Sequence, residues 1–197
     1  MNTRMAKPTP DELTAAEGRT VPDVIARDLS VLFCGVNPGL LSAAVGHHFA
    51  RPGNRFWKAL QLSGFTDRLL APEEGRELLR SGLGITNLVD RATRSADQLT
   101  RADLREGSER LARKVVRWHP RCIAVLGMGA YRSAFDRPAA RIGLQPEDLG
   151  AAKVWLLPNP SGLQARYQIA DIVEQMQELR SFASDGTHQR APGGGKP

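Results

Sequence analysis

The sequence predicts an α/β fold, a three-layer α/β/α sandwich built on a four-stranded parallel sheet. Four short runs of residues are almost continuously apolar, which is typical of strands covered on both faces. Helical patterns separate these runs along the chain. Because a strand, a helix and a second strand form a right-handed crossover, we expect the four strands to lie parallel to one another.

The four expected strands are short and rich in aliphatic residues, and turn residues follow the first of them directly. They cover residues 31–36, 84–89, 122–126 and 154–157. Apolar runs of this length, bounded by turn signals, are typical of buried strands.

The expected helices have apolar residues at helical spacing. They cover residues 54–63, 72–80, 102–118, 129–135 and 169–182. Asn54 is placed to cap the first helix, and Pro72 suits the first turn of the second. The helix over 102–118 has a basic face opposite its apolar face, and such a face is usually solvated.

The length of 197 residues suits one domain. We expect that domain over residues 29–183, after a mobile arm over 1–28 and before a flexible tail over 184–197. The sequence has no apolar run long enough to span a bilayer and no apolar core of a signal peptide near its start. We therefore expect a cytoplasmic monomer without a membrane partner.

The chain is basic, with 27 Lys and Arg against 21 Asp and Glu, a formal net charge of +6 and a pI of about 9.9. This balance favours a polyanionic partner, although a merely soluble basic protein is the alternative. Cys34 and Cys122 fall inside expected strands, which indicates buried, reduced thiols.

Residues 35–39 read Gly-Val-Asn-Pro-Gly and follow the first expected strand. Pro38 disfavours a helical conformation for Asn37, which should therefore lie on an extended loop. Loops at the carboxyl ends of parallel strands form the ligand crevice of α/β folds. The sequence therefore predicts that Asn37 offers its amide to a ligand, with a simple Asx turn as the alternative.

Three segments have the order and spacing of a known family. The first reads Gly-Val-Asn-Pro-Gly-Leu over 35–40 and continues into Gly-His-His-Phe over 46–49 and Pro-Gly-Asn-Arg-Phe-Trp over 52–57. The second reads Gly-Ile-Thr-Asn-Leu-Val-Asp-Arg over 84–91, and the third Leu-Pro-Asn-Pro-Ser-Gly-Leu over 157–163. Together they resemble the mismatch-specific uracil and thymine DNA glycosylases, a branch of the uracil-DNA glycosylase superfamily.

This resemblance implies an enzyme that flips uracil out of mismatched double-stranded DNA, notably at G·U, and hydrolyses its glycosidic bond without a cofactor. Asn37 matches the residue that positions the hydrolytic water. Phe49 matches the ring on which the flipped base stacks, although it could instead belong to the core. Val36 and Asn87 are implied to contact the base. Uracil-preferring bacterial members tend to have lysine at the position of Asn87, which leaves acceptance of thymine open.

The third segment is implied to insert a wedge into the duplex and to contact the base opposite the gap. Its residues for that role are Ser161, Gly162, Leu163 and Gln164. Phosphate contacts are expected from Arg55, Arg91 and Arg166, with Arg51 and Arg94 also close to the expected pocket.

Asp90 follows the second expected strand and has two interpretations. As a carboxylate near Asn37 it could act as general base or stabilise positive charge at the sugar. Alternatively, it forms an ion pair with Arg91 or Arg94 on a solvated loop. The adjacent histidines His47 and His48 lack a third ligand nearby, so we expect no metal site.

Two other functions are also compatible with parts of the sequence. The segment Gly-Met-Gly-Ala-Tyr-Arg over 127–132 begins like a dinucleotide-binding fingerprint, but Arg132 replaces its third glycine, which favours a tight turn. A non-catalytic DNA-binding module on the same fold is the second alternative. The matched segments contain no lysine placed as a Schiff-base amine, so the expected enzyme is monofunctional.

Overall fold

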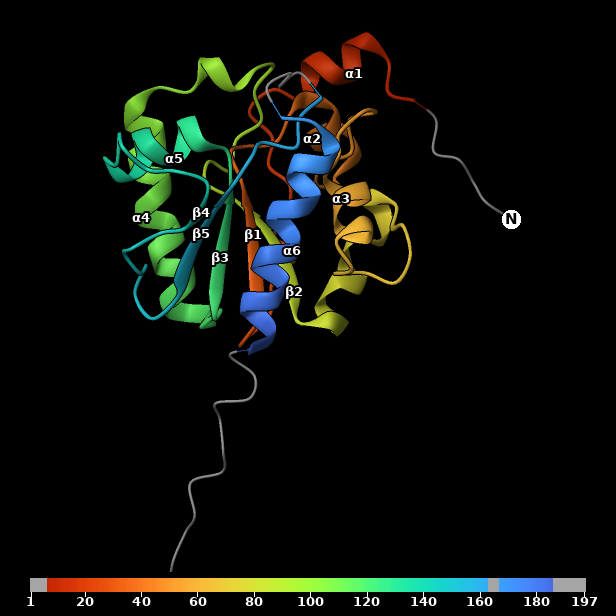
Figure 1. Ribbon diagram of the computed structural model, residues 1–197. Coiled ribbons are helices and arrows are strands. Elements are labelled where there is room, and N and C mark those ends of the chain that lie inside the picture. The colour runs from red at the N-terminus through yellow and green to blue at the C-terminus, as the bar shows by residue number, and fades with distance from the viewer. Residues whose placement is uncertain (1–6, 163–166, 186–197) are drawn as a thin grey trace, which may run out of the picture.

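A five-stranded mixed sheet forms the middle layer of the computed structural model, which describes residues 7–162 and 167–185 (Figure 1). The strand order is β2-β1-β3-β5-β4. The strands are β1 (Val31–Gly35), β2 (Leu83–Asn87), β3 (Cys122–Leu126), β4 (Gly143–Leu144) and β5 (Lys153–Leu157). All neighbours pair in parallel except β4 and β5, which are antiparallel.

The sequence predicted a sheet of four parallel strands. This prediction is wrong in one respect, because the sheet has a fifth strand, β4, which is antiparallel to β5. β1, β2, β3 and β5 are the four expected strands, and they do pair in parallel. β4 has only two residues, one of them glycine, so it leaves no apolar run in the sequence to indicate a strand.

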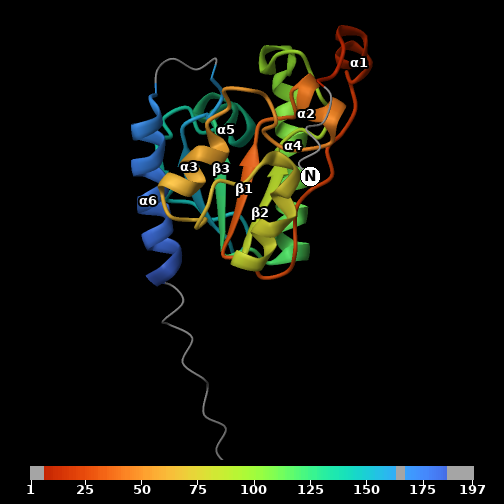
Figure 2. The same ribbon diagram turned by 90° about the vertical axis from the view of Figure 1, so that its right-hand side faces the viewer.

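Helices cover both faces of the sheet, as the sandwich prediction requires (Figure 2). The α-helices are α1 (Pro10–Ala15), α2 (Leu40–Val45), α3 (Phe56–Leu62), α4 (Arg101–Trp118), α5 (Met128–Phe135) and α6 (Ile169–Asp185); the 3-10 helices are η1 (Pro72–Ser81) and η2 (Ala96–Gln98). None of these helices is both long and apolar enough to cross a membrane.

Alternate side chains of the central strand β1 enter two separate cores. Val31 and Phe33 pack among residues of α3, η1 and α6 on one face. Leu32 and Cys34 pack among residues of α4 and α5 on the other. Cys34 and Cys122 are buried and free, and burial raises the pKa of each thiol to about 12.

Parts of residues 7–28, which the sequence suggested as a mobile arm, contact the domain. Thr9 and Glu12 form a capping box at the start of α1, and Ala16 is completely buried. Further along, Val24 exchanges two backbone hydrogen bonds with Ile85 beside β2. The few apolar residues of this segment are separated by prolines and charges, so no helical or strand pattern indicated this packing.

The two chain ends differ in how far the structure describes them. Residues 1–6 of the expected arm and 186–197 of the expected tail lie outside the described residues. Helix α6 extends through Asp185, slightly beyond the expected end of the domain.

Candidate active site

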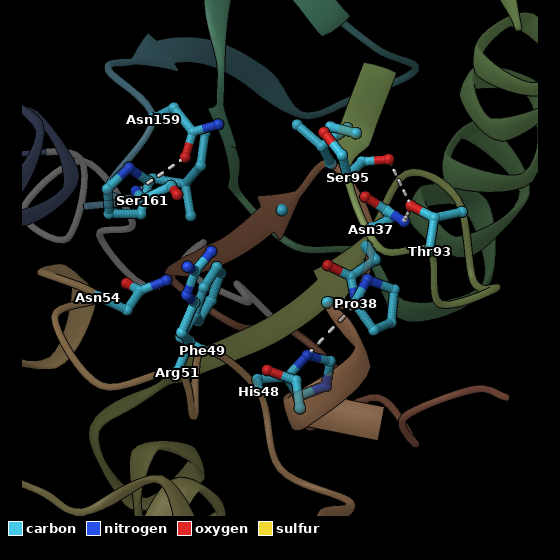
Figure 3. A pocket seen from close by; sticks show the side chains of 18 of the residues that line it. Asn37, Pro38, His48, Phe49, Arg51, Asn54, Thr93, Ser95, Asn159 and Ser161 are labelled. Carbon is cyan, nitrogen blue, oxygen red and sulfur yellow. Dashed lines mark hydrogen bonds between the residues drawn. The ribbon is translucent and has the colours of Figure 1, made fainter. Parts of the chain in front are cut away.

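A pocket of about 320 Å³ opens at the carboxyl ends of the parallel strands (Figure 3). Its walls come from the loop after β1, the loop before α3, the end of β2, the segment around η2 and the loop after β5. In open α/β sheets this is the edge where ligands bind. The chemistry-bearing residues that line it are Asn37, His48, Phe49, Arg51, Asn54, Asn87, Thr93, Arg94, Ser95, Asp97, Asn159 and Ser161.

The Asn37 amide is held in one orientation. Its Nδ2 donates to Thr93 Oγ1 at 2.7 Å and to the Arg91 carbonyl at 3.2 Å. The Thr93 hydroxyl, buried beneath the loop, donates onward to the Ser95 carbonyl at 2.8 Å. Since a carbonyl only accepts, the nitrogen side of the amide must face Arg91, and Oδ1 is turned toward the pocket (Figure 3).

Phe49 forms an aromatic wall of the pocket, close to Gly35. One face of its ring stacks on Phe56, with centroids 4.1 Å apart and planes inclined by 30°. A Cβ on Gly35 would lie 3.2 Å from Phe49 Cζ and only 2.5 Å from Asn87 Oδ1. The glycine therefore leaves the space in which the ring and the amide approach each other.

Val36 and Asn87 both line the pocket, and their implied contact with the base stays a prediction. Asn87 ends β2 and is only 5% exposed. The turn before α5 packs near Val36, since a Cβ on Gly127 would lie 3.1 Å from Val36 Cγ2. Gly127 caps α5 with a φ of 137°, so the segment over 127–132 begins with a tight strand-to-helix turn.

The sequence suggested that Arg55 contacts DNA phosphates. In the structure its guanidinium is instead directed toward the loop after β5. Its guanidinium donates to the carbonyls of Pro160, Ser161 and Asn159 and to that of Tyr167, across the segment that begins at the pocket. The contact to Ser161 is 2.9 Å. Arg55 therefore holds the loop after β5 in place, and its expected phosphate contact stays a prediction.

The other expected phosphate residues have different positions. Arg91 forms an ion pair with Asp103 at 2.9 Å and is not among the residues lining the pocket. Arg166 lies outside the described residues. Arg51 and Arg94 line the pocket, so they are the better placed cations for a bound polyanion.

The wedge segment is described only in part. Ser161 lines the pocket, and its backbone amide donates to Asn159 Oδ1 at 2.9 Å. Gly162 lies against the loop before α3, where a Cβ would come within 2.8 Å of the Gly53 carbonyl oxygen. Leu163 and Gln164 lie outside the described residues, so their expected contacts with DNA stay predictions.

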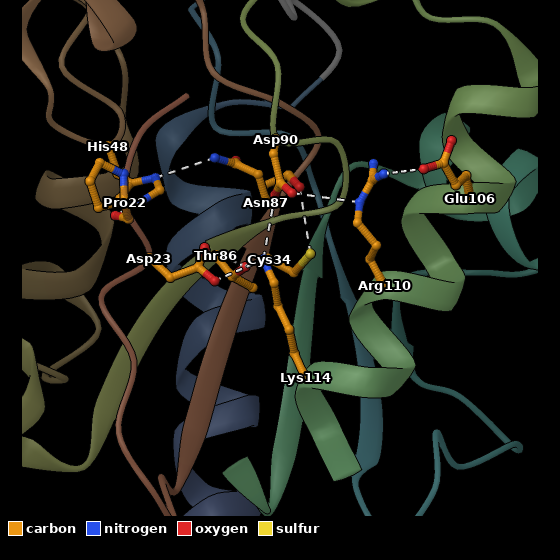
Figure 4. A network of polar contacts seen from close by, with 11 residues as sticks. Pro22, Asp23, Cys34, His48, Thr86, Asn87, Asp90, Glu106, Arg110 and Lys114 are labelled. Carbon is orange, nitrogen blue, oxygen red and sulfur yellow. Dashed lines mark hydrogen bonds and ion pairs between the residues drawn. The ribbon is translucent and has the colours of Figure 1, made fainter. Parts of the chain in front are cut away.

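Asp90 lies away from the pocket, against α4 (Figure 4). Its carboxylate is 3.4 Å from Lys114 Nζ and 3.6 Å from Arg110 Nε. Lys114 also contacts Asp23 at 2.7 Å and Thr86 at 2.9 Å. Burial opposes the charge of Lys114, but the hydrogen bond and charge of Asp23 and the charge of Asp90 raise its pKa above the ordinary value.

This environment corrects the expected ion pairs of Asp90, and its catalytic role stays a prediction. The structure does not bring its carboxylate to Asn37, and its partners are Lys114 and Arg110 rather than Arg91 or Arg94. Sequence position after a strand does not tell which way a side chain turns in the following loop. Among the described residues, no group of three or more His, Cys, Asp or Glu is arranged to hold a metal ion.

Fold and pocket together define an α/β domain with a polar site for a small ligand at the carboxyl ends of its strands. The model of the uracil DNA glycosylase superfamily matches residues 22–180. Since this match spans most of the chain, the protein belongs to the uracil DNA glycosylase superfamily. The match begins at residue 22, within the segment expected as an arm.

A solved structure has the same fold. It is the solution NMR structure of a candidate uracil DNA glycosylase from Methanosarcina acetivorans, with a TM-score of 0.57 and 17% sequence identity. The likeness covers 83% of this chain and 97% of that chain. Superfamily membership supports DNA repair glycosylase activity, whereas membership of the mismatch-specific branch stays a prediction.

Proposed function

We propose that this protein is a monofunctional DNA repair glycosylase that removes uracil from mismatched duplex DNA, with G·U as the favoured substrate. The single observation that carries the proposal is the Asn37 amide, whose Nδ2 is fixed by Thr93 and Arg91. Its oxygen is thereby presented beside the Phe49 ring in one pocket. Superfamily membership supports uracil as the base.

The target base of a duplex is inaccessible until its nucleotide is flipped out of the stack, which takes a few kcal/mol. In the proposed complex the base stacks on Phe49, and Asn37 Oδ1 accepts a hydrogen bond from the water that attacks C1′. A neutral amide oxygen orients this water but removes its proton poorly. Catalysis would then depend on fixed dipoles that stabilise the developing charge.

Water is the proposed nucleophile because the pocket offers no side-chain amine. None of the described lining residues is a lysine, so a Schiff base with the sugar has no donor there. The carboxylate of Asp97 lies at the exposed rim near Ser95, and Asp90 is held by Lys114. We therefore propose no general base among these two carboxylates.

The test is single-turnover incubation with a labelled duplex containing G·U, followed by alkaline cleavage of abasic sites. Strand scission supports the glycosylase, and binding without scission supports the non-catalytic DNA-binding module. Parallel reactions on A·U, G·T and single-stranded uracil test the preference for a mismatch. Discrimination against the single methyl group of thymine in an apolar pocket is worth only about 1–3 kcal/mol, so both bases must be measured. The monomeric state and cytoplasmic location stay predictions.

Replacing Phe49 by alanine should weaken binding of the flipped base. Stacking on an aromatic ring contributes about 1–3 kcal/mol per base, so we expect the dissociation constant for a G·U duplex to rise by roughly 5- to 150-fold. The measurement is fluorescence anisotropy under conditions that prevent turnover. Phe49→Leu is the control, because leucine keeps an apolar contact with Phe56 but offers no ring; restored binding in this variant would contradict the stacking role.

Asp90→Asn should leave the rate of uracil release nearly unchanged. The residue is half-exposed and pairs with cations on α4, and such pairs contribute about 0–1 kcal/mol to stability. Single-turnover rates and urea unfolding of the variant provide the measurement. A large loss of rate with unchanged stability would return Asp90 to a catalytic role.

A further inference from the structure

His48 connects the pocket amide Asn87 to the segment that precedes β1 (Figure 4). Its Nε2 lies 3.0 Å from the Pro22 carbonyl oxygen, and its Nδ1 lies 3.4 Å from Asn87 Nδ2. Both side chains are 5% exposed, and both line the pocket.

The two contacts determine where the hydrogens are. The Pro22 carbonyl can only accept, so Nε2 must carry a hydrogen. Burial lowers the pKa of His48 below its ordinary value, which favours the neutral ring with only one N–H. Nδ1 is then an acceptor, and Asn87 Nδ2 donates to it.

The same contacts orient the Asn87 amide. With its nitrogen toward His48, its oxygen is directed toward Gly35, where a Cβ would lie 2.5 Å away. Gly35 lines the pocket. The amide therefore presents an acceptor, and beside it the second hydrogen of Nδ2, on the side of the bound base.

This orientation distinguishes two bases of similar shape. Uracil has an N3–H donor beside the O4 acceptor, which matches an amide oxygen beside an amide N–H. Cytosine has an N3 acceptor beside an N4 amino donor, which matches the same amide only after it is turned over. A site built to hydrogen-bond one pattern discriminates because the other leaves buried polar groups unpaired.

We propose that His48 is a positioning residue that locks the Asn87 amide in the orientation selecting uracil over cytosine, with the Pro22 carbonyl as its fixed anchor. The inference rests on the proposed glycosylase function. His48 acts through Asn87 and is not assigned a direct part in bond cleavage.

The Pro22 carbonyl is held in place by contacts of the two residues that follow it, Asp23 and Val24. Asp23 forms an ion pair with Lys114 at 2.7 Å and accepts a hydrogen bond from Thr86 at 2.8 Å. Val24 is bound to Ile85 through two backbone hydrogen bonds. These contacts place the Pro22 carbonyl beside His48, and so the segment before β1 helps to determine the hydrogen-bonding pattern of the pocket.

The experiment compares two amide variants that each keep one half of the histidine. His48→Gln can place a donor near the position of Nε2 and keep the Pro22 contact, but it offers no acceptor at the position of Nδ1. His48→Asn can place its oxygen near Nδ1 and accept from Asn87, but it loses Pro22. The substrates are duplexes with 5-fluorouracil or 5-fluorocytosine opposite guanine, because fluorine makes each base a better leaving group.

The wild-type protein should release fluorouracil faster than fluorocytosine. We expect His48→Gln to reduce this rate ratio by at least about tenfold, and His48→Asn to keep it within about threefold of the wild type. A ratio unchanged by His48→Gln, or reduced equally by both variants, would overturn the inference. A wild-type protein unable to release any uracil would overturn the proposed function itself.

A second measurement does not depend on the variants folding. In the wild-type protein, nitrogen NMR of labelled histidine should show His48 as the neutral tautomer with its proton on Nε2. A proton on Nδ1 would overturn the lock, because Asn87 would then have to turn its oxygen toward the histidine. Thermal unfolding of both variants accompanies the rate measurements.

Discussion

Asn37→Ala is expected to slow single-turnover release of uracil from a G·U duplex by about 100- to 1000-fold, the usual loss when one preorganised polar group is removed from an active site. The variant removes the oxygen proposed to hold the attacking water. It leaves Phe49 and the cations Arg51 and Arg94 in place, so binding of the duplex should persist. Rapid-quench kinetics at saturating enzyme measure the rate, and anisotropy measures the binding.

Gln177→Ala is the matched control for this prediction. Gln177 is an exposed carboxamide on α6 and is not part of the pocket lining, so its removal should leave the rate unchanged. Wild-type single-turnover rates in Asn37→Ala would remove Asn37 from the mechanism. Equal losses of rate and binding would instead assign it to recognition of the DNA.

Arg55→Met should lower both the stability of the protein and the rate of base release. Methionine keeps an aliphatic stem but donates no hydrogen bond to the carbonyls of Asn159, Pro160, Ser161 and Tyr167. Removing the donor from a partly buried acceptor costs about 1–3 kcal/mol, and the Pro160 carbonyl keeps its bond from the backbone amide of residue 55, so we expect the free energy of unfolding to fall by about 3 kcal/mol or more. Urea unfolding measures this change.

The rate should fall as well, because Asn159, Pro160 and Ser161 form one wall of the pocket. Arg105→Met is the control, since Arg105 is an exposed arginine on α4. Unchanged stability together with a shallower salt dependence of DNA binding would assign Arg55 to phosphate contact, because the variant would then release fewer counterions on binding.

The parts of the fold found from the sequence are those specified by local pattern. Strands buried on both faces require apolar residues at every position, and 122–126 in β3 shows this directly. The two-residue β4 and the six-residue α2 are too short to have a periodicity of their own. β4 is held by its pairing with β5, and α2 packs against α1.

In the site, too, the sequence predicts what local residues determine and misses what distant contacts determine. Asn37 could be placed because Pro38 and the preceding strand determine its local backbone. Arg55 and Asp90 could not, because their partners lie far away in the chain: Arg55 binds carbonyls more than 100 residues later, and Asp90 meets Lys114 on α4. A charged residue beside a pocket loop can serve the ligand or the fold, and only the tertiary structure separates the two.

The two edge strands of the sheet, β2 and β4, affect how readily the protein aggregates in concentrated solution. An outer strand with free backbone groups is a template on which another polypeptide can extend the sheet, leading to aggregation. At the edge strand β2, Val24 already pairs with Ile85 and covers part of the backbone. At the opposite edge, β4 is only two residues long. We therefore expect removal of residues 1–24, Val24 included, to leave a protein more prone to self-association through β2.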